Sequence, residues 1–142
     1  MFFTAHKALK IQNNSPGPIP QLSREVSNAP GGWRLVAQKE YSVLASDLNQ
    51  KIKELEAVDA ASGSPRHKLI KIREAISQVV AGINKKVVFT VGELNNSTPI
   101  GEINQDGQYV LCYFALFYPL RSNVAQVQQH VCVAITKQEA YQ

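Results

Sequence analysis

The sequence lacks most of the features that mark specialised classes of protein. It has two cysteines, Cys112 and Cys132, which are too few for a disulfide-rich scaffold or a four-cysteine zinc site. No apolar run approaches the roughly 20 residues that a membrane helix needs. The 15 basic and 11 acidic residues are scattered and give a net charge of +4, so no basic block favours nucleic acid. We therefore expect no membrane partner and no nucleic-acid partner.

The sequence also lacks the motifs of common catalytic and metal sites. It has no phosphate-binding loop, no dinucleotide-binding fingerprint and no zinc-protease motif. The three histidines, His6, His67 and His130, fall in separate segments. His130 lies two residues before Cys132, on the same strand face by parity, but a catalytic pair or a metal site needs further groups to converge there. We expect no catalytic residues, no metal and no cofactor, and therefore no enzyme.

What is present fits one folded domain that follows an N-terminal arm. The length of 142 residues suits a single domain, and 44% is an ordinary share of hydrophobic residues for one. Pro16, Pro18 and Pro20 alternate in a stretch rich in Asn, Ser and Gly, which favours extended, unpaired backbone. We expect residues 1–28 to form a flexible arm, in which a short strand could form on docking, and residues 29–142 to form the domain.

The first residues do not have the pattern of a secretory signal. Lys7 and Lys10 interrupt any apolar core, and no small-residue cleavage site follows them. Either the protein stays in the cell or a leader has been removed from it.

Hydrophobic periodicity predicts one helix followed by strands. Tyr41, Leu44, Leu48, Ile52 and Leu55 recur at three- and four-residue spacing, which indicates an amphipathic helix over residues 36–57. β-Branched and aromatic residues then predict four strands, over residues 68–80, 86–91, 109–118 and 131–136. This order indicates an α+β fold, in which a single long helix packs on a four- to five-stranded antiparallel sheet.

A short motif gives the most specific signal. Gln78-Val79-Val80-Ala81-Gly82 lies between two predicted strands, where Gly82 can adopt the positive φ of a tight hairpin; alone, it would be an ordinary turn. The segment resembles the first hairpin loop of the cystatin family of cysteine protease inhibitors. The context fits as well, because Gly31-Gly32 precedes the long helix and Pro119 lies where the family has a Pro-Trp hairpin. The resemblance covers about residues 29–136.

The resemblance implies a reversible inhibitor of papain-like cysteine proteases, such as cathepsins of the L and B types. In the family, three segments at one end of the sheet form a wedge that enters the active-site cleft of the protease. The alternative is a cystatin-fold interaction or defence module with weak or no protease inhibition. The residues that match the wedge are Gly31, Gly32, Gln78, Val79, Val80, Ala81, Gly82, Pro119 and Leu120.

Departures from the family pattern favour weaker binding and a narrower activity. Ala29 and Pro30 stand where the family often has bulky aliphatic residues, so this segment buries less area. Leu120 replaces the hairpin tryptophan, a residue type that often anchors interfaces. The loop over residues 93–108 has no cysteine, so the first disulfide of secreted cystatins is absent. No asparagine occurs in residues 59–67, where some members use one to block legumain, so we expect that second activity to be missing.

The two cysteines gain a specific interpretation from the resemblance. Cys112 and Cys132 lie about where secreted cystatins place their second disulfide, and their position on paired strands favours that bond in an oxidising compartment. In a reducing compartment they would be two buried thiols. We expect a secreted monomer, with a dimer that exchanges its helix and first strand through residues 78–82 as the alternative. Secretion would also expose the glycosylation sequons that begin at Asn13, Asn95 and Asn96.

The aromatic residues have both a functional and a structural interpretation. Trp33 could contact the protease or pin the start of the helix onto the sheet, and we favour the second because large aromatic side chains are usually buried. The aromatic cluster of residues 109–118 could stack on bases, but a strand that packs under a helix has the same composition. We expect this cluster to form core.

Overall fold

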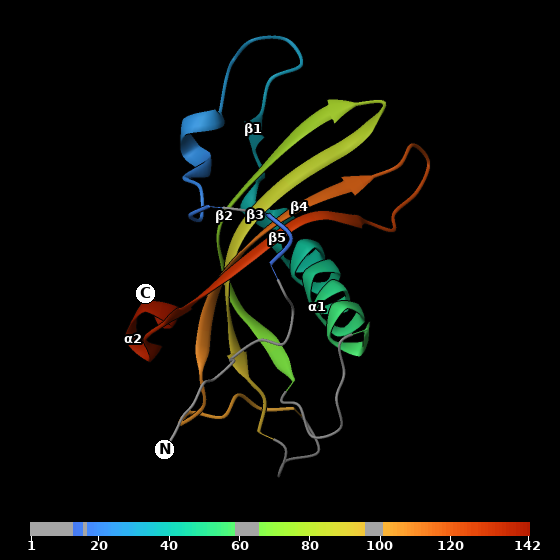
Figure 1. Cartoon of the computed structure of the whole chain (residues 1–142). Coiled ribbons are helices and arrows are strands. Elements are labelled where there is room, and N and C mark those ends of the chain that lie inside the picture. Colours follow the sequence, from blue (N-terminus) through green and yellow to red (C-terminus); the bar gives the residue numbers. More distant parts are fainter. Residues whose placement is uncertain (1–12, 16, 59–65, 96–100) are drawn as a thin grey trace.

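The computed structural model describes residues 13–15, 17–58, 66–95 and 101–142, in which one long helix packs on a five-stranded sheet (Figure 1). The strands lie in sequence order, and each pairs antiparallel with the next. The predicted α+β fold is confirmed. The elements are the 3₁₀ helix η1 (Leu22–Glu25), β1 (Arg34–Leu35), the 3₁₀ helix η2 (Gln38–Glu40), α1 (Tyr41–Val58), β2 (His67–Val80), β3 (Gly82–Glu93), β4 (Tyr109–Tyr118), β5 (Gln126–Ile135) and α2 (Lys137–Tyr141).

The helix α1 begins five residues later than the periodicity predicts. The preceding residues form β1, which pairs with β2 at Ser77 and Ile76. The Val36 N–H then donates to the Ala75 carbonyl at 2.9 Å, so the backbone up to this point belongs to the sheet. The helix can begin only after this pairing ends. Neither α1 nor any other helix in the described part of the chain is long and apolar enough to cross a membrane.

One face of the sheet packs against α1. Leu44, Leu48 and Ile52 are buried on the helix, as their spacing predicts. Phe89 of β3 and Phe114 of β4 belong to the same cluster, and their rings meet edge to face with centroids 4.9 Å apart. Full burial of each such side chain is worth about 1.5–3 kcal/mol, so this cluster holds helix and sheet together.

The other face of the sheet is covered as well. Leu22 of η1 joins Ile76 of β2 and Val131 of β5 in a second buried cluster. The short helix α2 lies against β2, β3 and β4. The strand pattern does not predict α2, although Thr136 and Glu139 form a capping box at its start, which is a recognisable helix signal. Segments from both ends of the described chain therefore cover the face that α1 leaves open.

Part of the expected arm, within residues 17–28, packs on the sheet in this structure. Leu22 is fully buried, because an apolar side chain in a polar segment gains free energy by packing on the sheet. The carboxylate of Glu25 lies 2.6 Å from the ammonium of Lys86 on β3. Residues 1–12, which include His6, Lys7 and Lys10, lie outside the described residues. The flexible arm over residues 1–28 and the domain boundary at residue 29 stay predictions.

The N-terminal segment also reaches the edge strand β5. The Asn14 N–H donates to the His130 carbonyl at 3.1 Å, and the Asn14 Oδ1 accepts the His130 N–H at 2.7 Å. The Asn13 Oδ1 accepts the Cys132 N–H at 2.8 Å. These bonds satisfy backbone groups that an edge strand otherwise presents to other chains.

Two strands extend beyond their predicted starts. β3 begins at Gly82 instead of residue 86, and β5 begins at Gln126 instead of residue 131. The added parts carry Asn, Lys and Gln side chains that are exposed or half-buried, so the apolar alternation is weak there. Pairing with β4 nevertheless holds both segments in the sheet.

Cys112 and Cys132 form a disulfide, as their placement predicts. The two residues lie opposite each other on β4 and β5, with Cα atoms 4.1 Å apart. Cys112 is fully buried in the cluster between helix and sheet. The bond therefore holds the edge strand β5 in register from inside the core.

Replacing both Cys112 and Cys132 by alanine should lower the free energy of unfolding by about 3 kcal/mol. The disulfide spans 20 residues, and a closed loop of that size restricts the unfolded chain by this amount. Urea unfolding of the variant and of the wild type measures the difference. Wild type kept in a reducing agent should lose a similar amount, and a loss below about 1 kcal/mol in both samples would contradict a structural role for the bond.

Candidate functional site

Three chain reversals lie close together at one end of the sheet (Figure 1). We call them the first tip (residues 29–32, before β1), the second tip (residues 79–82, where β2 ends and β3 begins) and the third tip (residues 119–123, between β4 and β5). Strand pairing brings them together, because Arg34 lies opposite Ser77 and Ile83 lies opposite Tyr118. Apart from Gln78, which directly precedes the second tip, every residue predicted to bind a protease lies in one of the three.

The first tip is a hydrogen-bonded turn. The Gly32 N–H donates to the Ala29 carbonyl at 3.0 Å, and Gly31 has a φ of +75°. Proline at the second position and a positive-φ glycine at the third are the signature of a type II turn, which Ala29, Pro30 and Gly31 supply. A Cβ on Gly32 would lie 3.0 Å from the Ala29 and Ser27 carbonyl oxygens. Both glycines therefore serve the shape of the turn.

The side chain of Gln78 joins the first tip to the second. Its Nε2 donates to the Gly31 carbonyl at 3.0 Å. Its Oε1 accepts a hydrogen bond from the Asn84 Nδ2 across the hairpin at 3.2 Å. Gln78 of the motif thus links the first tip to the hairpin, a role that the sequence alone does not reveal. Asn84 supports Gln78, and the sequence did not identify it in this role.

Gly82 allows the second tip to lie against the third. Its φ is +121°, and β3 begins directly at this residue. A Cβ built there would lie 2.5 Å from the Tyr118 carbonyl oxygen and 2.8 Å from the ring of Phe117. No side chain larger than hydrogen fits this contact without a shift of the backbone. Gly82 is therefore needed both for the turn and for the close approach to β4.

The third tip is a turn stabilised by its own hydrogen bonds. The Ser122 N–H donates to the Pro119 carbonyl at 3.0 Å, and the Ser122 Oγ accepts from the Val124 N–H at 3.1 Å. Arg121 has a φ of +64°, a conformation that is uncommon for a residue other than glycine. This turn presents Leu120 to solvent.

The tips concentrate exposed apolar side chains. Val79 is 74% exposed, Val80 is 46% exposed and Leu120 is 68% exposed. Between the second and third tips lies a groove of about 610 Å³. The groove and these exposed apolar side chains make this end of the sheet the candidate site of interaction with a partner. The groove is lined by Val79, Val80, Gly82, Ile83, Tyr118, Pro119, Leu120, Arg121, Ser122 and Asn123.

Tyr118 supports the third tip from below. Its hydroxyl donates to the Asp47 carboxylate of α1 at 2.6 Å, which ties the end of β4 to the helix. Burial of the phenol, followed by this contact with Asp47, holds the pKa of Tyr118 well above its ordinary value. The ammonium of Lys85 lies 4.9 Å from the centroid of the ring. The hydroxyl therefore stays protonated and acts as a structural donor.

The other sequence candidates take structural positions. Cys132 is in the disulfide, so it forms no pair with His130. His130 packs edge to face on Phe114, and burial lowers the pKa of its imidazole. Trp33 packs against the second cluster, under the ammonium of Lys86. Most of the predicted aromatic core is buried, namely Tyr109, Tyr113, Phe114 and Tyr118, while Phe117 is half-buried.

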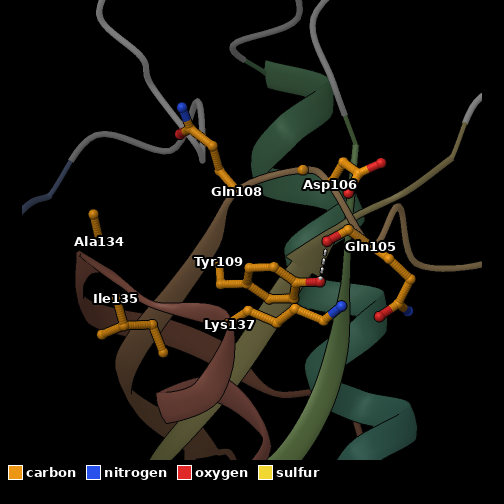
Figure 2. A pocket seen from close by; sticks show the side chains of 8 residues that line it. Gln105, Asp106, Gln108, Tyr109, Ala134, Ile135 and Lys137 are labelled. Carbon is orange, nitrogen blue, oxygen red and sulfur yellow. Dashed lines mark hydrogen bonds between the residues drawn. The ribbon is translucent and has the colours of Figure 1, made fainter.

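A second hollow lies at the opposite end of β4 and β5 (Figure 2). Its volume is about 360 Å³, and the Tyr109 hydroxyl within it donates to the Gln105 carbonyl at 3.1 Å. Asp106 and Lys137 are its charged residues. Within the described ranges, no group of three His, Cys, Asp or Glu side chains could hold a metal ion. The tips are thus the better candidate, because they combine a groove with exposed apolar side chains.

Solved structures with a similar fold are cystatins. The crystal structure of Al-CPI superimposes with a TM-score of 0.58 at 20% identity, covering 74% of this chain and all of that one. Dimeric human cystatin F gives a TM-score of 0.57 at 15% identity, covering 78% of this chain and 94% of that one. A salivary cystatin of the soft tick Ornithodoros moubata gives 0.50 at 16% identity, with coverages of 74% and 99%. No protein-family model and no curated protein matches the sequence.

Replacing Gly82 by alanine should destabilise the protein more than replacing Gly101 by alanine. Both positions have a positive φ, which costs an alanine about 1–3 kcal/mol. At Gly101 the nearest atom to a new Cβ is 3.8 Å away, whereas at Gly82 it is the Tyr118 carbonyl at 2.5 Å. Urea unfolding of both variants measures the difference. Equal losses would mean that the contact with β4 relaxes without cost.

Proposed function

The chain has the cystatin fold, and from this premise we propose that it is a reversible inhibitor of papain-like cysteine proteases, such as cathepsins of the L and B types. The three tips enter the active-site cleft together and exclude substrate from it. The observation that supports this proposal is the geometry of the tips. Gln78 connects the first two tips, and Gly82 lets the second pack against the third. The tips expose the apolar side chains of Val79, Val80 and Leu120.

The second tip supplies the largest apolar contact. Val79 and Val80 project from the hairpin, and burying a valine fully is worth about 1.5–3 kcal/mol. Their β-branched side chains have few rotamers to lose on binding. The hairpin backbone is already held by Gln78 and Asn84. Little conformational entropy is therefore lost when the cleft closes around it.

The first and third tips contribute less than their counterparts in the family pattern. Ala29 and Pro30 offer little apolar area to a specificity pocket. Leu120 offers an aliphatic contact where the pattern has tryptophan, which costs about 1 kcal/mol or more at an interface. The affinity therefore depends mainly on the second tip, and the target is a protease whose cleft accepts a narrow aliphatic edge.

Inhibition by this wedge needs no chemistry from the inhibitor. The tips contain no histidine, cysteine, aspartate or glutamate. The second tip fills the cleft without laying an extended peptide bond across the catalytic thiolate, so the inhibitor is not cleaved. We accordingly propose that the protein is not an enzyme and uses neither a cofactor nor a metal.

We further propose that the protein acts outside the cell as a monomer. The disulfide between Cys112 and Cys132 supports an oxidising compartment. Exchange of α1 and β2 between two copies would straighten residues 78–82 and remove the second tip, so such a dimer would not inhibit.

The predicted lack of activity against legumain concerns residues 59–67, of which 59–65 lie outside the described residues. Asn96 lies outside them too, and glycosylation at Asn13, Asn95 or Asn96 stays a prediction.

Wild-type protein should inhibit papain or a cathepsin L-like protease in a titration of residual activity. Val79→Asp should weaken inhibition by about 10–100-fold, because it places a charge in an apolar contact. The matched control is Val133→Asp, an exposed valine of β5 close to the opposite end of the sheet, which should inhibit like wild type.

Two outcomes would contradict this prediction. If micromolar wild-type protein leaves the activity of every papain-like protease unchanged, the inhibitor proposal is wrong, and the alternative of an interaction or defence module takes its place. The small side chain of Ala29 and the absence of tryptophan at residue 120 favour that alternative. If Val79→Asp and Val133→Asp inhibit equally, the second tip is not the main contact.

Association with a protease that has an acidic cleft rim should slow as salt is added. The tip regions, residues 27–35, 77–85 and 117–126, each carry one cation, Arg34, Lys85 and Arg121, and no carboxylate. Raising salt from about 20 mM to about 0.5 M should lower the association rate at least about threefold and leave dissociation almost unchanged. Arg121→Gln should reduce this dependence, whereas Lys137→Gln at the other end should not. An association rate that does not change with salt concentration would contradict electrostatic steering.

A further inference from the structure

We propose that residues 17–26 are a strap that positions the first tip for inhibition, with Leu22 as its anchor and the Glu25–Lys86 ion pair as its link to the tip. The inference rests on the proposed function and deepens it, because it names positioning residues that lie outside the tips. The strap passes over the sheet face opposite α1 and leads directly into the first tip (Figure 1).

Leu22 anchors the strap. Its side chain is completely buried in the second cluster, although neighbouring residues of the strap are exposed. A fully buried leucine in an otherwise polar segment is a specific docking contact, since water would otherwise cover it. The cluster around it is formed by Ile76, Val88, Tyr113, Ala115 and Val131, with Ile19, Trp33 and Leu111 packed against it.

Glu74 fixes the orientation of the strap on β2. One carboxylate oxygen accepts the Leu22 N–H at 2.9 Å, and the other accepts the Ser23 N–H at 3.1 Å. These are the first two N–H groups of η1, which have no partner within that helix. A carboxylate at this position both satisfies them and carries the favourable charge for a helix start. The strap can therefore dock in one register only.

Lys86 connects the strap to the residue that follows the first tip. Its ammonium lies 2.6 Å from the Glu25 carboxylate and 4.6 Å from the centroid of the Trp33 ring. Both members of the ion pair are partly buried. The pair is therefore less screened than one on the open surface, and it fixes the strap and Trp33 to the same point on β3.

The strap closes the base of the first tip. Val26, the last residue of the strap, forms a bridge with Trp33, and the N–H of the next residue, Ser27, donates to the Trp33 carbonyl at 2.9 Å. The turn between these contacts is further held by Gln78, which binds the Gly31 carbonyl. Without the strap, the first tip would be held only by β1 and by the Gln78 hydrogen bond, and its N-terminal side would be free. The strap thus makes a rigid loop of a segment that the sequence alone suggests is free to swing.

Charge reversal at either member of the ion pair should weaken inhibition, and exchange of the two charges should restore it. We expect Glu25→Lys and Lys86→Glu each to raise the inhibition constant about tenfold, and the double variant to return to within about threefold of wild type. Asp106→Lys makes the same change in net charge as Glu25→Lys, but at the opposite end of the sheet, and should inhibit like wild type. Leu22→Ala should weaken inhibition as the single reversals do.

A second readout follows the strap itself and needs no protease. Trp33 is the only tryptophan, so its emission should shift to the red in each single variant and return in the double variant. Hydrogen exchange at the Ser27 and Gly32 amides should quicken and recover in parallel. The proposal would be overturned if the single variants shift the emission and quicken the exchange but inhibit like wild type. It would also be overturned if they leave the Trp33 emission and the exchange of both amides unchanged. If wild type inhibits no papain-like protease, the proposed function fails, and emission and exchange alone decide whether the strap exists.

Discussion

The end of the sheet that carries the three tips depends on the close approach of Gly82 to the end of β4. With no Cβ at this position, the start of β3 can lie directly against the Tyr118 carbonyl and the Phe117 ring. The second and third tips are then neighbours, with a groove between them. The same strand end is tied to α1, because the Tyr118 hydroxyl donates to Asp47. The hairpin, the last connection and the helix therefore meet at Tyr118, which Gly82 approaches on one side and Asp47 of α1 binds on the other.

The tips are exposed, whereas both faces of the sheet are covered. α1 packs on one face, while η1 and α2 lie on the other. Asn13 and Asn14 bind backbone groups of the edge strand β5, which leaves less of that edge open for pairing with other chains. Val79, Val80 and Leu120 are exposed at the tips, and Leu35, Val43 and Val124 are exposed to a similar degree outside them. What sets the tips apart is that their exposed side chains line a groove, which is the basis of the proposed contact with a protease.

The sequence predicts the helix and strands in which apolar residues recur at regular spacing, and it misses the features that depend on a single contact between distant residues. The core of α1 follows from the spacing of Leu44, Leu48 and Ile52, and the strand pattern places the disulfide on facing strands. The motif at residues 78–82 predicts the second tip. The docking of Leu22 could not be predicted, because a single leucine among prolines and polar residues has no period, and its partner surface comes from strands 50 to 110 residues away. The link from Gln78 to Gly31 was hidden for the same reason, since a side-chain bond across 47 residues leaves no local pattern.

The docked strap also changes the physical basis on which the first tip could contribute to binding. A free arm gains contact area in a protease cleft but loses backbone entropy for each residue that becomes ordered, about 1–2 kcal/mol per residue. Ala29 and Pro30 offer too little apolar area to offset such a loss over several residues. A turn that is already closed by Ser27 and held by Gln78 avoids most of it. Small side chains at this tip are therefore compatible with binding when the tip is rigid, and poorly suited to it when the arm is free. The buried Leu22 on the far face of the sheet thus offsets the small contact area of Ala29 and Pro30.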